Sequence, residues 1–355
     1  MPGPPFDLPG ALAQWQTNGG QRVILKAGGV VLLPGKQSIL QGCARAPVTC
    51  GELVQGAIAG QDFLVTCPLE LYSRVVVYIE PEPGNGRVSF GEPEGAFPLY
   101  PVEILSGQPE SEVAKAVLAV RKTIALFGLR PRRVWLDLSC PAPAGKGMGS
   151  SSADIVAAAR AAALSLGRAL TPRQLARLAL SIEPSDGVMF PGVTLFDHRR
   201  GKIARVLGAA PPAKVLIFDY GGKVDTLGFN HHPSLQMLNR AKEKEVTPAL
   251  KKVLHGLQRS SLDLIGEGAT QSALAHQGIL PKADLAEIAA AVSKMGARGV
   301  VCAHSGTVIG VLYPRESPRS KECERFLSRL GYGEILGEFL LGGAAKVSGG
   351  KSNGI

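Results

Sequence analysis

The pattern of apolar and polar positions predicts strands and helices that are mixed along the chain. Between Ser111 and Phe127, apolar side chains recur every three or four residues and Gly128 follows, which predicts an amphipathic helix. The alanine-rich segment from Ala153 to Leu166 predicts a second helix that is buried on most sides. Further strands are predicted at 63–65, 72–79, 133–138, 193–196, 203–206, 214–219, 299–303 and 307–313, with a last apolar run at 335–341. Further helices are predicted at 172–182, 249–258, 261–276, 282–294 and 319–330.

The distribution of proline and glycine divides the chain into parts. Residues 1–43 are rich in both and carry two short apolar patches, so we expect a hairpin or an appendage of unknown role outside the main fold. A Gly-Pro-Pro junction at 208–212 separates two mixed regions, 44–208 and 209–345, and a tail of residues 346–355 follows. The pattern therefore predicts an α+β protein of two lobes with a cleft between them.

Composition excludes several classes of protein. Of the 355 residues 45% are hydrophobic, which is enough for one large or two modest domains. The formal net charge of +10 attracts anions such as ATP, and equally nucleic acid. However, the sequence holds no zinc-finger spacing and no aromatic-rich RNA-binding strand, so we expect no nucleic-acid partner.

The cysteines and the apolar segments indicate the cellular compartment in which we expect the protein. Six cysteines are scattered without a C-x-x-C pair, which argues against a zinc site or a disulfide framework and fits a reducing cytosol. The N-terminus lacks the pattern of a signal peptide, and no apolar stretch reaches the roughly 20 residues of a membrane span. We therefore expect a cytoplasmic protein with no membrane partner.

The most informative segment is Pro143–Asp154, with the sequence PAGKGMGSSSAD. It follows a predicted strand and leads into the alanine-rich helix. Its glycines allow the backbone to approach a ligand, and the first turn of the helix offers free N–H groups and the positive end of the dipole. Such a site binds anions, usually phosphate, and the serines can cap the helix or reach a phosphate-bound Mg²⁺. A plain turn is the alternative, because Gly and Ser clusters are common in turns.

A second group of polar residues is Glu183-Pro184-Ser185-Asp186-Gly187. Pro184 disfavours helical geometry at Glu183, so the preceding helix should end here. Two carboxylates near a helix C-terminus favour a cation, such as Mg²⁺ that carries nucleotide phosphates, or could orient a substrate hydroxyl and accept its proton. A surface turn is an equally good interpretation of this segment alone. The segment Ala303–Val308 is similarly either a ligand-facing connection or a tight turn.

Taken together, these segments resemble the GHMP kinases. The loop P143…GMGSS resembles their nucleotide loop. The blocks TCGELVQG at 49–56, SIEPSD at 181–186 with TLFDH at 194–198, and AHSGTV at 303–308 resemble a narrower branch, the kinases that phosphorylate L-threonine for cobalamin synthesis. The resemblance covers roughly residues 44–345. It implies an N-terminal lobe like domain 2 of ribosomal protein S5, a ferredoxin-like C-terminal lobe, and a reaction between ATP and L-threonine.

The resemblance also implies roles for particular residues. The phosphates of ATP would be held by Gly145, Lys146, Gly147, Met148, Gly149, Ser150, Ser151 and Ser152. Ser151 would lie nearest Mg²⁺, Glu183 would share the ion, and Asp186 is the candidate catalytic base. The cleft would be lined by Thr49, Gly51, Glu52, His304, Ser305 and Gly306. The loop departs from the usual family pattern at Met148 and Ser152, and the division of roles between Glu183 and Asp186 stays open.

Other functions compete with this one. A kinase of the same fold could act on homoserine, a sugar or an isoprenoid precursor, because one side chain in a pocket can change the choice of substrate. A regulator that binds nucleotide but lacks catalysis is a second alternative, against which the carboxylate pair argues. A nucleic-acid-binding protein with an S5-like lobe is a third.

Overall fold

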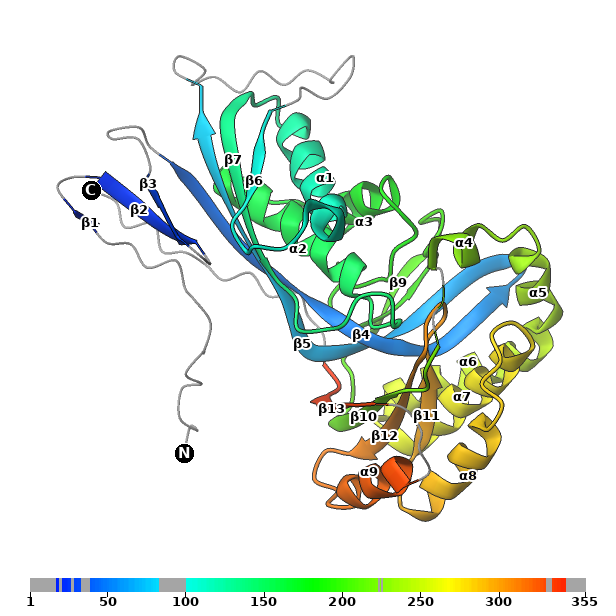
Figure 1. Ribbon diagram of the computed structural model, residues 1–355. Coiled ribbons are helices and arrows are strands. Elements are labelled where there is room, and N and C mark those ends of the chain that lie inside the picture. Colours follow the sequence, from blue (N-terminus) through cyan, green and yellow to red (C-terminus); the bar gives the residue numbers. More distant parts are fainter. Residues whose placement is uncertain are drawn as a thin grey trace.

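The computed structural model describes residues 17–18, 21–26, 29–32, 39–82, 100–222, 224, 226–329 and 334–342. Its centre is a pair of long antiparallel strands, β4 (Leu40–Ile58) and β5 (Gln61–Pro81), which run diagonally through the molecule (Figure 1). The predicted strands at 63–65 and 72–79 are parts of the single strand β5. The strand continues through Pro68, which interrupts the apolar pattern of the sequence. Near this proline the pairing register between β5 and β4 shifts, so Pro68 lies at an irregularity of the sheet.

One ten-stranded sheet connects both halves of the chain. Its order is β13-β10-β12-β11-β4-β5-β7-β6, with β8 paired to β5 and β9 paired to β8. The strands are β6 (Val102–Ile104), β7 (Pro131–Ser139), β8 (Val193–Phe196), β9 (Ala204–Gly208), β10 (Ala213–Asp219), β11 (Gly299–Cys302), β12 (Val308–Pro314) and β13 (Ile335–Leu340). The halves join where Cys302 of β11 is paired with Glu52 of β4. The mixed order and the helices around it agree with the α+β expectation.

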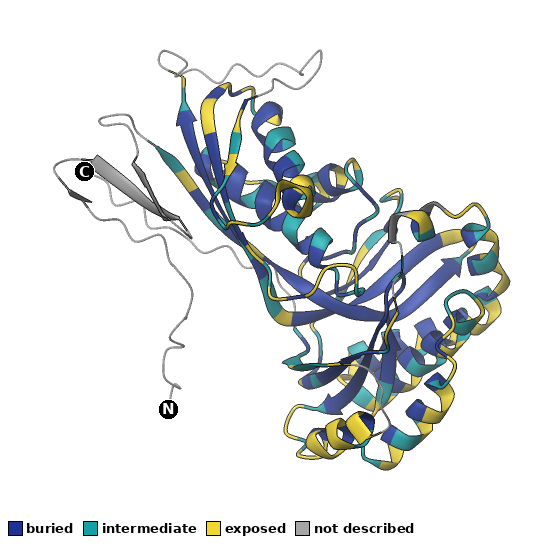
Figure 2. Cartoon of the chain, in the orientation of Figure 1, coloured by how far each residue is buried: buried dark blue, intermediate teal, exposed yellow. Residues whose placement is uncertain are grey.

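Helices cover different stretches of this sheet. In the first half, α1 (Glu110–Leu126), α2 (Ser150–Ser165) and α3 (Pro172–Leu180) lie together, and α2 packs directly on β4 and β5. In the second half, α6 (Glu243–Arg259) and α7 (Leu262–Ala275) pack on the far end of β4, while α8 (Leu285–Lys294) and α9 (Ser320–Arg329) lie farther out (Figure 1). Figure 2 shows that the middle parts of β4 and β5 are buried, whereas the outer helices carry both exposed and buried residues.

The sequence pattern missed some elements here. The long strand β4 was not predicted, because Pro47 and three glycines interrupt its apolar pattern, and its first residues lie within the segment 1–43 that was expected outside the main fold. Two short helices, α4 (Thr226–His231) and α5 (Leu235–Ala241), and the strand β6 were not predicted either, because none is long enough to show a period. Helix α6 begins at Glu243 rather than 249, since it tolerates Pro248 near its start. The expected hairpin near the N-terminus is found as β2 (Gln21–Lys26) and β3 (Gly29–Leu32), which form a separate sheet with β1 (Thr17–Asn18).

The two proposed lobes share one core. The main apolar cluster joins Val156 of α2 and Val65 of β5 to Val246 and Ala269 of the second half. A smaller cluster fills the space between β10–β12 and helices α8 and α9. The proposed boundary at 208/209 falls in the connection between β9 and β10, although sheet and core continue across it. Within the described part of the chain, no helix combines the length and apolarity that a membrane crossing requires.

Candidate active site

The glycine-rich loop connects β7 to α2 and is tied to both halves of the molecule. The carbonyl of Met148 accepts the N–H of Thr49 in β4 at 2.8 Å. The carbonyl of Lys146 accepts the N–H groups of Thr307 and Val308, at 2.9 and 3.0 Å, from the second half. Thus the loop lies where the two halves meet, and its backbone conformation depends on both.

Three glycines of the loop have positive φ angles, and two of them have no space for a side chain. A Cβ on Gly147 (φ +87°) would lie 2.4 Å from the Cβ of Ala303, and one on Gly149 (φ +60°) would lie 2.5 Å from Oδ2 of Asp186. Gly145 (φ +74°) would meet nothing within 4 Å. Residues at 147 and 149 must therefore be glycine for reasons of space and conformation, whereas Gly145 faces open space.

The serines do not cap the helix, contrary to the sequence expectation. The N-cap is Gly149, in the left-handed conformation and without a side-chain cap, and the three serines occupy the first helical positions of α2. The hydroxyl of Ser151 instead donates to a carboxylate oxygen of Glu183, and Ser152 Oγ accepts the N–H of Asp186 at 3.0 Å. The hydroxyls of Ser151 and Ser152 thus hold Glu183 and Asp186 beside the N-terminus of α2.

The segment 181–186 follows α3, which ends at Leu180 as Pro184 predicted. Glu183 is buried and forms an ion pair with Lys115 of α1 at 2.5 Å. Asp186 is half-buried and lines the same cavity. Desolvation by burial, and then repulsion by Glu183, raises the pKa of Asp186 to about 6. Asp186 is therefore mostly ionised at neutral pH and can accept a proton.

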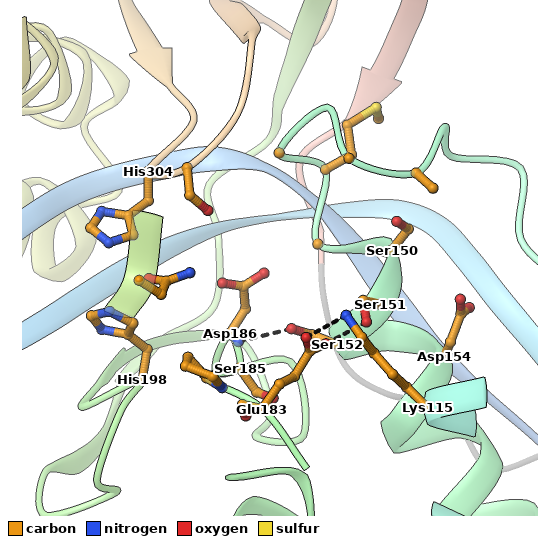
Figure 3. A pocket seen from close by; sticks show the side chains of 18 of the residues that line it. Lys115, Ser150, Ser151, Ser152, Asp154, Glu183, Ser185, Asp186, His198 and His304 are labelled. Atoms are coloured by element: carbon orange, nitrogen blue, oxygen red, sulfur yellow. Dashed lines mark hydrogen bonds and ion pairs between the residues drawn. The ribbon is translucent and has the colours of Figure 1, made fainter. Parts of the chain in front are cut away.

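The cavity of about 340 Å³ extends from the loop past Asp186 to a second wall that contains Glu52, His198 and His304. Figure 3 shows the histidines on one side of Asp186, and Glu183, Ser151 and Lys115 on the other. The rings of His198 and His304 meet edge to face, with their centroids 4.9 Å apart. Burial lowers the pKa of His198 to about 4, so this ring is neutral at physiological pH.

The structure brings most of the predicted site residues together. Those that line the cavity are Gly145, Gly147, Met148, Gly149, Ser150, Ser151, Ser152, Glu183, Asp186, Glu52, His304 and Ser305. Thr49, Gly51 and Gly306 lie behind the loop and support its backbone rather than line the cavity. Lys146 does not line it either: its ammonium forms an ion pair with Asp219 at 2.5 Å.

Sequence reasoning missed several cavity residues. Lys115 lies on α1, which the sequence marked only as an amphipathic helix, and Asn230 lies outside every motif block. Asp154 ends the glycine-rich segment, but the sequence assigned it no role. His198 lies within a motif block, but no role followed from its position. Arg45 of β4 and Arg74 of β5 are both absent from the lining, and Arg45 lies over the ring of Tyr72.

The residues present fit a magnesium ion that arrives with a nucleotide. Glu183 and Ser151 contact each other through oxygen atoms, the ligand type that Mg²⁺ prefers, at a helix terminus suited to phosphates. No cluster of three or more His, Cys, Asp or Glu side chains that could hold a metal occurs among the described residues. Mg²⁺ bound with nucleotide needs only one or two protein carboxylates, so this arrangement is sufficient.

Comparisons with known proteins agree with this geometry. Residues 111–190 match the family model "GHMP kinases N terminal domain". The chain is 32% identical over 276 residues to an L-threonine kinase from Citrobacter freundii, covering 77% of this chain and 86% of that protein. It is equally identical over 273 residues to an L-threonine kinase from Salmonella typhimurium, covering 77% and 83%. Homoserine kinase from Cytophaga hutchinsonii has a similar fold, with a TM-score of 0.60 and 14% identity over 88% of this chain and 97% of that structure.

Fold, site and comparisons together define a phosphotransferase that uses an alcohol group as acceptor. The chain belongs to the GHMP kinase family.

Proposed function

We propose that this enzyme transfers the γ-phosphoryl group of ATP, with Mg²⁺, to the hydroxyl of L-threonine and releases O-phospho-L-threonine. This product would serve the aminopropanol arm of cobalamin synthesis. The observation that carries the proposal is the position of Asp186, which lies between the amide-rich terminus of α2 and the second wall of the cavity. The names of the two bacterial relatives support threonine as the acceptor.

The phosphates of ATP would be bound mainly by backbone N–H groups. The first intrahelical hydrogen bond of α2 runs from Ala153 to Gly149, so the amides of residues 150–152 have no acceptor within the helix. Together with the loop they would bind the phosphates. Ser151 and Glu183 would hold Mg²⁺, which neutralises charge on the phosphates when bound. Lys115, now paired with Glu183, would then exchange this carboxylate for phosphate oxygens.

On the acceptor side, Asp186 would orient the threonine hydroxyl and accept its proton. A serine hydroxyl at the start of α2 holds the backbone of Asp186, and Gly149 lies directly against its carboxylate, so the position of this group is fixed. In phosphoryl transfer, positioning and electrostatic stabilisation account for most of the acceleration. A carboxylate held in place between the phosphoryl donor and the acceptor hydroxyl would supply the positioning.

The test is an assay of ADP release with L-threonine, L-serine and L-homoserine as acceptors. We expect the highest kcat/KM with threonine and detection of O-phospho-L-threonine as the product. If homoserine turns over much faster than threonine, the acceptor assignment is wrong and the enzyme is another kinase of this family.

A further inference from the structure

Positively charged side chains line only one side of the cavity. Lys115 is the only lysine or arginine among the described residues that line it, and it lies on the Glu183 side (Figure 3). Beyond Asp186 the wall contains Glu52 and two histidines that are neutral at physiological pH. This end of the cavity therefore attracts a cationic group and has no charged partner for an anionic one.

Glu52 is a buried carboxyl group that forms no ion pair with any residue that the structure describes. Its side chain is nine-tenths buried or more, and Oε2 has no hydrogen-bond partner among the described residues. Burial, with a contribution from the charge of Asp186, raises the pKa of Glu52 well above its ordinary value. An unpaired buried carboxyl is costly when ionised, so this position favours a ligand that brings a positive charge.

The imidazole of His304 is held in one tautomer. Gln55 donates from Nε2 to the carbonyl of Cys302 at 3.2 Å, so its Oε1 faces His304 and accepts from Nδ1 at 2.8 Å. The proton of the neutral ring is therefore on Nδ1, and Nε2 carries a lone pair. Nε2 is buried and has no partner among the described residues.

A second chain of hydrogen bonds fixes the backbone of His304. The ammonium of Lys242 lies 2.9 Å from Nδ1 of His276 and can only donate, so the ring of His276 accepts there. Its Nε2 then donates to the carbonyl of His304 at 3.0 Å. His304 is thus held from both its backbone and its side chain, and the direction of its free lone pair is set by residues behind the cavity.

We propose that Glu52 and Nε2 of His304 form the ammonium-binding end of the acceptor site, which selects alcohols that carry a primary amine near the reacting hydroxyl. This inference rests on the proposed function and names the group of the substrate that the second wall recognises. Oε2 of Glu52 and Nε2 of His304 are both buried. The ammonium would reach them after a small rotation of the Glu52 side chain and would restore the charge of its carboxylate.

The sharpest test uses 3-hydroxybutanoate, which keeps the hydroxyl, methyl and carboxylate groups of threonine and lacks the amine. We expect the wild-type enzyme to prefer L-threonine by about 100-fold or more in kcat/KM, because the analogue leaves the buried acceptors unpaired. Equal use of the two compounds by the wild-type enzyme would overturn the ammonium site, and this comparison needs no variant.

Variants of Glu52 and His304 test whether these two residues cause the preference for the amine. We expect Glu52→Gln to raise the KM for L-threonine by about 10- to 100-fold, since a hydrogen bond to a charged group is lost, while the KM for ATP is unchanged. His304→Leu should act in the same direction. In both, the preference for threonine over 3-hydroxybutanoate should fall, which a general folding defect would not produce. His255→Gln, on an exposed position of α6, is the matched control and should behave as wild type.

The outcomes separate the two proposals. If the wild-type enzyme prefers serine or homoserine to threonine but still rejects 3-hydroxybutanoate, the threonine assignment fails and the ammonium site stands. If threonine is the best substrate and both variants keep the wild-type preference for it over 3-hydroxybutanoate, the ammonium site is wrong and the proposed function stands.

Discussion

At the loop end of the cavity, the chemistry belongs to the backbone of one short segment, whereas at the histidine end it belongs to side chains from distant segments. Residues 145–152 present amides and positive φ angles that depend on glycine. Glu52, His198 and His304 come from β4, the segment after β8 and the segment after β11. A backbone site leaves one continuous pattern in the sequence, whereas an assembled side-chain site leaves separate blocks that only the fold brings together.

The largest effect is expected from Asp186→Asn, which removes the candidate base between the two ends. We expect kcat to fall by about 10²- to 10⁴-fold because the amide cannot accept the proton. Nucleotide affinity, measured by calorimetry, should stay within a few-fold of wild type, since the loop end is untouched. Asp263→Asn, at an exposed position on α7, is the control. Unchanged turnover would remove Asp186 from the mechanism.

Two glycines of the loop allow a test of how tightly the loop end of the cavity is packed. Gly147→Ala adds a Cβ at a positive φ and 2.4 Å from Ala303, so we expect a loss of about 2–5 kcal/mol in the free energy of unfolding. Gly145→Ala adds only backbone strain and should cost about 1–2 kcal/mol. Denaturant unfolding of both variants measures the difference. Equal losses would mean that contact with Ala303 does not constrain the loop.

The pKa of Asp186 predicts the pH dependence of the reaction. The carboxylate accepts a proton only when ionised, so kcat/KM for the acceptor should be half-maximal near pH 6, level off about one unit above it, and fall about tenfold per unit well below it. Asp154, whose pKa is also raised to about 6 by burial, lines the cavity and could produce a similar inflection. Asp154→Asn should therefore keep the profile of the wild type; a flat profile in this variant would assign the inflection to Asp154.

The smallest effect is expected from Lys146→Met. The sequence suggested that Lys146 binds phosphate, but its ammonium is paired with Asp219 and its side chain is outside the cavity lining. The pair is partly exposed, so its loss should cost about 0.5–1 kcal/mol of stability and change the KM for ATP by no more than a few-fold. Lys252→Met, which removes an exposed pair with Glu267, is the control. A large rise in the KM for ATP would restore Lys146 to the phosphate site.

Much of the architecture could be predicted from the sequence, because helices such as α1 carry a clear period and buried strands such as β10 a continuous apolar run. The loop, the end of α3 before Pro184, and the proximity of Glu183 and Asp186 to the serines were also foreseen. Lys115 and Asn230 were not, since each is positioned by an element whose local pattern reflects packing. The tautomer of His304 depends on Gln55, which is 249 residues away in the sequence, and no local signal contains that information.

The double hydrogen bond to the carbonyl of Lys146 has a consequence for how such an enzyme can diversify. Because backbone N–H groups from both halves bond to the carbonyls of three consecutive loop residues, 146–148, an insertion or deletion there would misalign the two halves. At the opposite wall, by contrast, exchanging one side chain alters recognition and leaves the scaffold intact. New acceptors are therefore accessible through single substitutions, while the backbone of the glycine-rich loop stays the same.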